Sequence, residues 1–352
     1  MKSESQLEKR QRKILIAVVC SYISSAEPVG SRTIARKYDF GISPATIRNI
    51  MADLEESGFL AQPHTSAGRV PTDKGFRFYV DHLKHSLQSL EHITSFNIED
   101  ILHNEAEIGN LMKKTTDLLS RLSHQAGLML APNLKNTVCR HIDFIKLNNS
   151  QTLVIFISES GHVHKRVIRL GEDISQDTFD QMSRLITNEL MGLSLTKIRS
   201  KLMDMLSAEK IKFDALYARA VKLSQQFFDE EVDESELYLG GTFNMMNHPE
   251  FADIEKIKAL FQAFEEKRIL LSIIDKCLEE ELEGAKVIIG EENSVVDMQD
   301  LSFVLSSYNY GERLLGVVGV IGPKRMDYTQ VIPMVEYTAK TISRLLTNRI
   351  ES

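Results

Sequence analysis

Side chains that can read DNA base edges are concentrated in one short segment of the sequence. Arg48 can bond guanine through two hydrogen bonds, and Asn49 can do the same with adenine. Small side chains beside them can pack against a thymine methyl group. At the start of the segment, hydroxyls and backbone N–H groups can contact phosphate. The residues of this candidate base-reading face are Ser43, Ala45, Thr46, Arg48, Asn49 and Ala52.

A helix over this segment would present these side chains on one side. Its other side would carry the apolar stripe Ile47, Ile50, Met51 and Leu54, at the spacing of a helix face that packs on a core. Ser43-Pro44 is typical of a helix start, and Gly58 of the position just after a helix end. A solvated surface helix with no ligand remains the alternative interpretation.

The flanking elements make up the rest of a winged helix-turn-helix. A first helix is expected over about residues 5–23, and a second over Arg32–Tyr38 with Ser31 as its N-cap. Two short strands, Phe59–Gln62 and Arg69–Val70, flank a tip of small and polar residues. Thr72 is expected to cap a further helix. A winged helix that contacts protein instead of DNA stays open as an alternative.

The wing and the neighbouring helices supply candidates for contacts to the DNA backbone. Asp53, Glu55 and Glu56 would be repelled by phosphate, so the N-terminal half of the base-reading helix should enter the groove. Basic and small polar residues around that helix would bind phosphate or the minor groove. These candidates are Ser31, Arg32, His64, Thr65, Ser66, Arg69, Lys74 and Arg77.

The charge distribution agrees with one DNA-contacting part. The formal net charge is −7, but residues 1–85 hold 13 Lys+Arg against 9 Asp+Glu, and the rest hold 29 against 40. A basic N-terminal piece on an acidic body is the asymmetry expected when one domain touches nucleic acid.

Composition indicates a globular cytoplasmic protein. The 352 residues, 43% of them hydrophobic and 26% charged, allow two or three domains. Three widely spaced cysteines favour neither a disulfide framework nor a zinc site. There is no apolar run long enough to span a membrane and no signal-peptide core, so we expect no membrane partner.

The remaining sequence predicts alternating helical and strand-rich stretches. We expect a linker over 91–105, a helix from Ile108, and a meander of three strands, 138–147, 153–157 and 163–170. The middle strand is apolar throughout and is expected to be covered on both faces. Three more strands follow a mainly helical stretch of about 110 residues. The economical interpretation is one six-stranded antiparallel domain interrupted by a helical insert.

No enzyme site is expected. The sequence offers no nucleophile with a base and no phosphate-binding loop. His162 and His164 alternate on one strand, but they have no further ligand at metal-binding spacing. We therefore predict no catalytic residue, no metal and no cofactor.

Several strings of the sequence resemble the HrcA family of heat-inducible transcription repressors. They are Glu27–Ala35, Ser43–Glu55, Gly68–Arg77, Gly240–Thr242, His248–Phe251, Ile289–Asn293 and Gly319–Tyr328. The resemblance implies an α+β multidomain protein: a winged helix-turn-helix, then a GAF-like antiparallel-sheet domain interrupted by a mainly helical dimerisation module. The corresponding limits are 1–90, 91–105 for the linker, 106–192 and 251–352 for the GAF-like domain, and 193–250 for the insert.

The resemblance also implies partners. A homodimer would bind an inverted-repeat operator in double-stranded DNA and repress chaperonin and co-chaperone operons, with the chaperonin GroEL keeping the repressor active. The alternative is a ligand-sensing regulator, in which a small molecule in the GAF-like domain sets DNA affinity.

Overall fold

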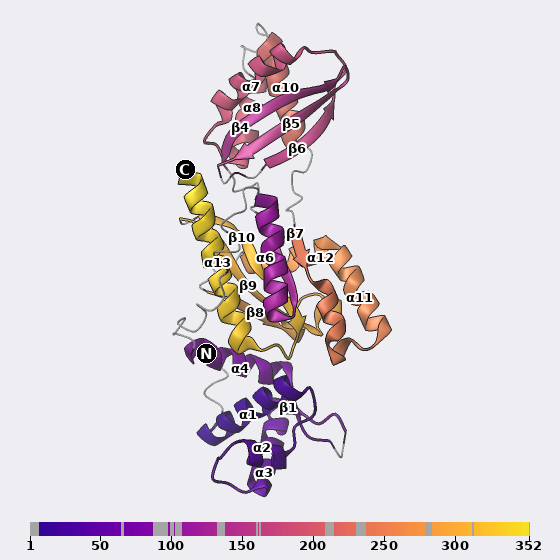
Figure 1. Ribbon diagram of the computed structural model, residues 1–352, viewed down its shortest axis with the longest axis vertical. Helices are drawn as coiled ribbons and strands as arrows, with labels where there is room; N and C mark the ends of the chain where they lie inside the picture. The colour runs from indigo at the N-terminus through magenta and orange to yellow at the C-terminus, as the bar shows by residue number, and fades with distance from the viewer. Residues whose placement is uncertain are drawn as a thin grey trace.

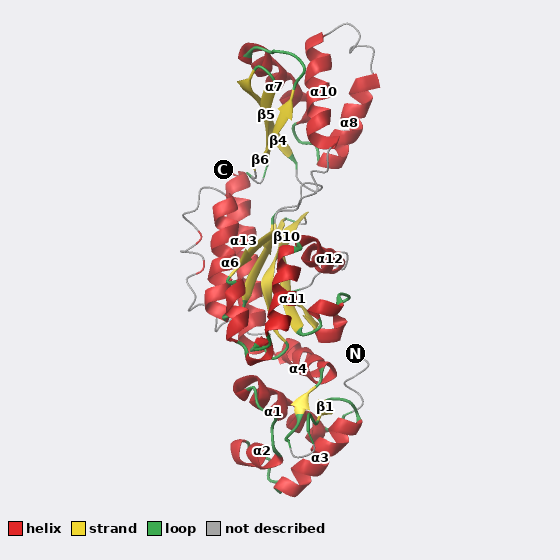
Figure 2. Ribbon diagram, turned by 90° about the vertical axis from the view of Figure 1, so that its right-hand side faces the viewer, coloured by secondary structure: helices red, strands yellow, loops and turns green. Residues whose placement is uncertain are grey.

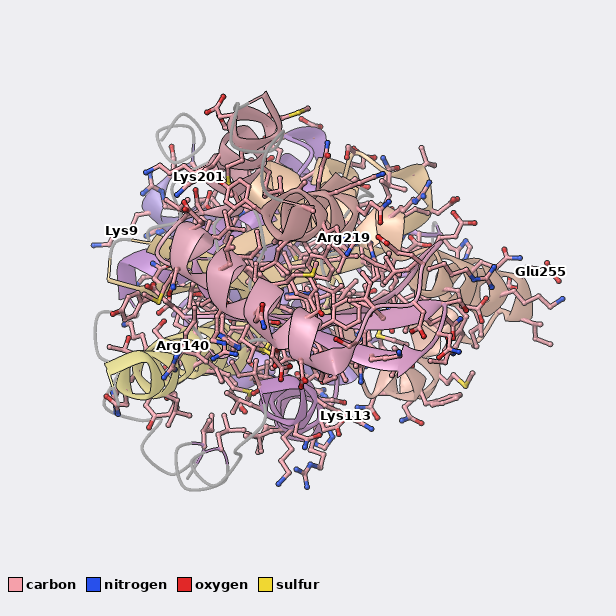
Figure 3. All side chains as sticks on the ribbon, turned by 90° about the horizontal axis from the view of Figure 1, so that it is seen from above. Lys9, Lys113, Arg140, Lys201, Arg219 and Glu255 are labelled. Carbon is pink, nitrogen blue, oxygen red and sulfur yellow. The ribbon has the colours of Figure 1, made fainter. Side chains whose placement is uncertain are left out.

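The computed structural model places three bodies along one long axis (Figure 1). A head formed by the N-terminal residues lies at one end, a five-stranded sheet lies in the middle, and a three-stranded sheet with helices lies at the other end. Seen along that axis, a helix carrying Glu255 projects to one side (Figure 3). The described residues are 7–64, 67–86, 98, 102, 108–131, 138–159, 161, 163–207, 215–229, 237–278, 284–311 and 313–351.

The head, residues 7–86, has the element order that the sequence predicts. Three helices precede an antiparallel hairpin, in which Leu60 pairs with Pro71 and Ala61 with Val70. A fourth helix follows it. The elements are α1 (Lys9–Ser25), α2 (Ser31–Lys37), α3 (Pro44–Glu56), β1 (Leu60–Ala61), β2 (Val70–Pro71) and α4 (Asp73–Ser86).

Local sequence explains how α3 begins and ends. The Ser43 hydroxyl accepts a hydrogen bond from the Thr46 N–H at 3.1 Å, so the predicted N-cap is confirmed. Gly58, at φ +76°, supplies the left-handed turn after the helix. The predicted cap of α2 is wrong by one residue, because Gly30 is the N-cap and Ser31 the first helical residue.

The middle body is a five-stranded antiparallel sheet of order β7-β3-β10-β9-β8. On one face α6 and α13 pack against it, and on the other face α11 and α12 (Figure 2). The elements are α6 (Ile108–Ser123), β3 (Ala126–Leu130), β7 (Leu237–Gly240), α11 (Ile254–Glu265), α12 (Lys267–Leu278), β8 (Lys286–Ile289), β9 (Leu301–Tyr310), β10 (Arg313–Pro323) and α13 (Tyr328–Glu351).

The outer module, residues 138–229, has its own sheet and core. Its strands are in the order β4-β5-β6, and Ile142, Phe144, Val154 and Phe156 face a helix layer that includes Phe179. The elements are β4 (Cys139–Asn148), β5 (Gln151–Ser158), β6 (Val163–Arg169), α7 (Gln176–Leu190), α8 (Leu195–Ser207) and α10 (Ala215–Asp229).

The expectation of a single six-stranded sheet is wrong. The strands predicted within 138–170 form the outer module's separate sheet, and the middle sheet instead contains β3 and β7. These two strands have five and four residues, too short for a clear alternating pattern. The predicted limit at residue 193 also divides α7 from the helices α8 and α10 that pack with it.

In the part of the chain that the structure describes, the middle strand of that meander is covered on one face only. Val154 and Phe156 of β5 are fully buried, whereas Leu153, Ile155 and Ile157 are half-buried. A continuous apolar run does not reveal which partner covers each face, so the prediction of two covered faces is wrong for this single chain.

Other expectations concern the linker, the cysteines and the membrane. Of residues 91–105, the structure describes Ile98 and Leu102, which are both buried; the rest of the predicted linker lies outside the described residues. Cys139 is buried and Cys20 half-buried, both as free thiols. Over the described ranges, no helix combines the length and the apolar character that crossing a membrane requires.

Candidate nucleic-acid interface

The base-reading face of α3 is open to solvent at the free end of the head (Figures 1 and 2). Ile47, Met51 and Leu54 are buried on the opposite side, as predicted, and Ile50, the fourth residue of the predicted stripe, is half-buried against the same core. The exposed residues of the face are Ser43, Ala45, Thr46, Arg48 and Asn49, and Ala52 is half-buried.

The start of α3 is partly occupied by its own cap. Ser43 Oγ lies 2.9 Å from Thr46 Oγ1 and accepts the Thr46 N–H. That N–H is therefore already bonded within the helix and is not free for the predicted phosphate contact. The two exposed hydroxyls and the positive end of the helix remain favourable to an anion.

The hairpin base is fastened to α3. Arg69 Nε lies 2.7 Å from Glu55 Oε2, and the Arg69 side chain is 18% exposed. Arg69 also pairs with Val29 through two backbone hydrogen bonds, of 2.8 and 2.9 Å. A Cβ on Gly68 would lie 2.5 Å from the Val29 carbonyl, so only glycine permits this approach.

The hairpin tip is partly described. His64 is exposed, and Gln62 Nε2 donates to the Ala67 carbonyl at 3.1 Å across the tip. Thr65 and Ser66, predicted to reach DNA, lie outside the described residues.

Lys74 contacts the end of α3 and the start of the hairpin, but Arg77 does not. Lys74 Nζ donates to the Ser57 carbonyl at 2.9 Å, just after α3, and lies 4.2 Å from the centre of the Phe59 ring. The Arg77 guanidinium instead binds Glu292 and donates to the Val287 carbonyl at 2.7 Å, both in the middle body. Burial acts to lower the pKa of Arg77, but the hydrogen bond and charge of Glu292 outweigh it and raise that pKa.

Basic residues that the sequence analysis missed lie on α1 and α2. Arg32, predicted as a phosphate contact, is exposed near the start of α2, and Arg36 and Lys37 are exposed at its end. On α1, three cations line a cleft of about 360 Å³ beside the turn before α3. Its lining residues are Lys9, Arg10, Lys13, Ile14, Asp39, Phe40 and Ile42. The basic run from Lys9 to Lys13 was the available signal.

The described side chains that the head exposes are suited to binding an anionic ligand and not to holding a metal ion. Within the described ranges, no group of three or more His, Cys, Asp or Glu residues could hold a metal. His162, half of the histidine pair weighed in the sequence analysis, lies outside these ranges. What the head presents is a capped helix with exposed Arg48 and Asn49, a fastened hairpin and surrounding cations.

Comparisons with known proteins agree with this geometry. The model of the HrcA protein C terminal domain matches residues 109–332. A heat-inducible transcription repressor HrcA of Syntrophobacter fumaroxidans is 41% identical over 97% of this chain and 98% of its own. One of Geobacter sulfurreducens is 42% identical over 97% and 99%.

A solved structure shares the fold. The crystal structure of a protein described as hypothetical, at 2.2 Å resolution, matches with a TM-score of 0.65 and 25% identity, covering 98% of this chain and all of its own. The relatives are named as repressors and not as enzymes. The family match and the full-length relatives show that the chain belongs to the HrcA family of heat-inducible transcription repressors.

Proposed function

We propose that this repressor binds an inverted-repeat operator as a homodimer and blocks transcription of chaperonin and co-chaperone operons. The observation that carries the proposal is the exposed face of α3, with Arg48 and Asn49 outward over buried Ile47 and Met51. A helix with this face fits the major groove, where Arg and Asn can distinguish bases. The protein would act in the cytoplasm, with the DNA.

In this proposal the head is a winged helix-turn-helix. Helices α2 and α3 form the helix-turn-helix, α3 reads bases, and the hairpin is the wing. The residues that we propose for phosphate and minor-groove contacts are Ser31, Arg32, Ser43, Thr46, His64, Thr65, Ser66 and Lys74, with Lys9, Arg10 and Lys13 on α1. Arg69, predicted as a further contact, instead pairs with Glu55 and fastens the hairpin. Arg77 is left out, because its guanidinium is engaged with the middle body.

The domain layout that we propose follows the two sheets. The middle body, with strands β3 and β7–β10, is the GAF-like domain, and residues 138–229 are its insert. Buried side chains pack both faces of the middle sheet, and Tyr308 is fully buried with its hydroxyl donating to the Leu130 carbonyl at 2.7 Å. This filling favours a scaffold over the alternative of a ligand-sensing domain.

The insert is the proposed dimerisation module, because one face of its sheet carries aliphatic side chains that no helix of the described residues covers. Helices α7, α8 and α10 pack with the opposite face, on Phe144 and Phe156. Val163 and Val167 on β6 are 52% and 50% exposed, and Leu147 on β4 is 49% exposed. The aliphatic residues of this open face are Ile145, Leu147, Leu153, Ile155, Ile157, Val163 and Val167.

Charge placement on the open face favours a second copy as the occupant. The strand register aligns Asp143, Ile155 and Lys165 in one row, with the acid on β4 and the base on β6. A two-fold axis parallel to the strands and above β5 would stack β4 of one protomer on β6 of its partner. Asp143 would then face Lys165 of the partner subunit, twice, with Ile155 near the axis.

Chaperonin dependence rests on the family resemblance. We propose that GroEL keeps the repressor competent, so that heat, by occupying the chaperonin, releases the operons. The repressor is refolded with and without chaperonin. We expect a larger DNA-competent fraction when the chaperonin is present. Equal fractions would contradict this part of the proposal.

Footprinting on chaperonin-operon promoters tests the operator proposal. We expect protection of two symmetric half-sites by the wild-type protein and none by Arg48→Ala at the same concentration. No protected duplex from these promoters would contradict the proposal.

A further inference from the structure

Three sequence strings that lie far apart in the chain meet where the head contacts the middle body. They are the segments around Glu250, around Glu291 and around Arg325. The segments around Glu291 and Arg325 bind the head directly, and Glu250 binds Arg325. The candidate base-reading helix α3 takes part in none of these contacts. Their convergence points to a joint between two bodies, and we call these contacts the junction.

The first contact is made by the start of α4. The Asp73 carboxylate lies 2.8 Å from Lys324 Nζ and accepts the Glu291 N–H at 2.9 Å. A Cβ at Gly290 would lie 2.0 Å from the Asp73 carboxylate, and Gly290 has φ +53°. Glycine is therefore required twice here, for the backbone conformation and for the space that Asp73 fills.

The second contact lies one turn further along α4. Arg77 Nε donates to Glu292 Oε1 at 2.6 Å, and another guanidinium nitrogen bonds the same carboxylate. Glu292 Oε2 also accepts the Ile289 N–H at 2.9 Å. A two-pronged Arg–carboxylate contact whose acid is held by the backbone fixes direction as well as distance.

The third contact reaches α1. Arg325 pairs with Glu250 and also donates to the Ile23 carbonyl at 3.2 Å, close to the end of α1. Beside it, three aromatic rings form a row. The Phe76 ring lies between those of Tyr22 and Tyr328, with its centroid 6.2 Å from the Tyr22 centroid and 6.5 Å from the Tyr328 centroid. The apolar core is continuous from the head into the middle body at this point.

We propose that the junction positions the head, and thereby determines which half-site spacing the dimer accepts. This inference rests on the proposed operator binding. Both α1 and α4 are held, so the head cannot turn about a single hinge. With both heads fixed to a two-fold body, the two copies of α3 are a set distance apart, and half-sites at another spacing cannot bind both. Heads on a loose tether would tolerate changed spacing.

Spacing selectivity is the measurement that separates positioning from base reading. The probes are the footprinted operator, the same duplex with one to five base pairs added or removed between half-sites, and a duplex with a single half-site. The test protein carries Asp73→Asn and Glu292→Gln together. The control is Glu291→Gln, which removes one negative charge next to Glu292 and whose carboxylate makes none of the junction contacts.

We expect the double variant to bind the single half-site as the control does. Its preference for the native spacing over a shifted one should fall by about fivefold, the scale expected for losing partly exposed ion pairs. An unchanged preference in a folded double variant would overturn the inference. Failure of the wild-type protein to bind any of the duplexes would instead overturn the proposed function.

A second variant covers the case in which the double variant does not fold. Lys324→Gln removes only the Asp73 ion pair and leaves the Glu292 contacts in place. It should reduce the spacing preference in the same direction by a smaller factor. A Lys324→Gln protein with wild-type spacing preference would count against the junction.

Discussion

Arg69 and Glu55 connect the base of the hairpin to the last turn of α3 through an ion pair of 2.7 Å. Both side chains are largely shielded, at 18% and 32% exposed. The pair removes a negative charge from the C-terminal half of α3, where a free carboxylate would repel phosphate. It also uses a cation that the sequence alone would give to DNA.

Replacing Arg69 with alanine should therefore weaken DNA binding without changing base preference. Glu55 would regain its free charge near the DNA, and the hairpin would lose one fastening, at a stability cost of up to about 1 kcal/mol. Gel-shift titration on operator and unrelated duplex should show similar losses on both. Adding Glu55→Gln should recover part of the affinity, and a loss confined to the operator would contradict this role.

Arg48→Ala tests base reading. Arg48 is exposed on α3, and a good bidentate contact to a base discriminates by about 1–3 kcal/mol. We expect the affinity for the operator to fall by that amount and base choice to relax at one position of each half-site. Competition assays with single-base operator variants measure this directly.

The control for Arg48 is Arg268→Ala. Arg268 is exposed on α12 of the middle body, so its substitution removes one positive charge far from the proposed groove contact. Wild-type affinity for the operator is expected there. If Arg48→Ala and Arg268→Ala bind equally well, Arg48 does not read a base.

The head could be predicted from sequence because its signals are local. The Ser43 cap, the apolar stripe from Ile47 to Leu54 and the turn at Gly58 each lie within a few residues of the element they define. The same kind of local signal placed the start of α6 at Ile108, where the structure has it.

The errors arose where the partner is distant in sequence. Residue 139 begins a strand of a separate sheet, because β3 pairs with β10 and β7 instead of with β4. Arg77 is a basic residue on an N-terminal helix, but Glu292 binds it from 215 residues away. Neither spacing nor composition shows which distant segment a strand or a cation contacts.

The dimer proposal makes a charge-reversal prediction. With Asp143→Lys, a lysine would face Lys165 of the partner subunit at both ends of the proposed interface. With Lys165→Asp, an aspartate would face Asp143 of the partner subunit at the same two places. Each should raise the dimer Kd roughly 30-fold, equivalent to about 2 kcal/mol. The protein carrying both changes restores opposite charges and should recover dimerisation, as measured by analytical ultracentrifugation.

A matched change on the covered side of the module separates charge pairing from general damage. Glu172→Lys alters a surface acid whose partner is Arg219, away from the open sheet face. It should leave the dimer intact. If Asp143→Lys and Lys165→Asp both remain dimeric, or if the double change does not restore the dimer, the two-fold arrangement is wrong.

His248 predicts a loss of stability at mildly acidic pH. It lies beside the junction, and burial lowers its pKa below 6.5, with the Arg325 charge acting in the same direction against Glu250 and the His124 carbonyl. The unfolded chain then takes up the proton more readily than the folded one. The stabilisation from neutral His248 is full above pH 6.5 and is lost as the pH falls through its folded pKa.

His248→Gln removes this titration and should flatten that part of the profile. Urea unfolding at about pH 7.5 and about pH 5.5 should show a smaller drop in unfolding free energy for the variant than for the wild-type protein. His64→Gln, at an exposed position on the hairpin, is the control and should keep the wild-type drop. Because Arg325, a charged neighbour of His248, pairs with Glu250 and donates to the Ile23 carbonyl of the head, the wild-type preference for operator spacing should weaken over the same pH range. A variant with an unchanged pH profile would show that His248 is not the group responsible.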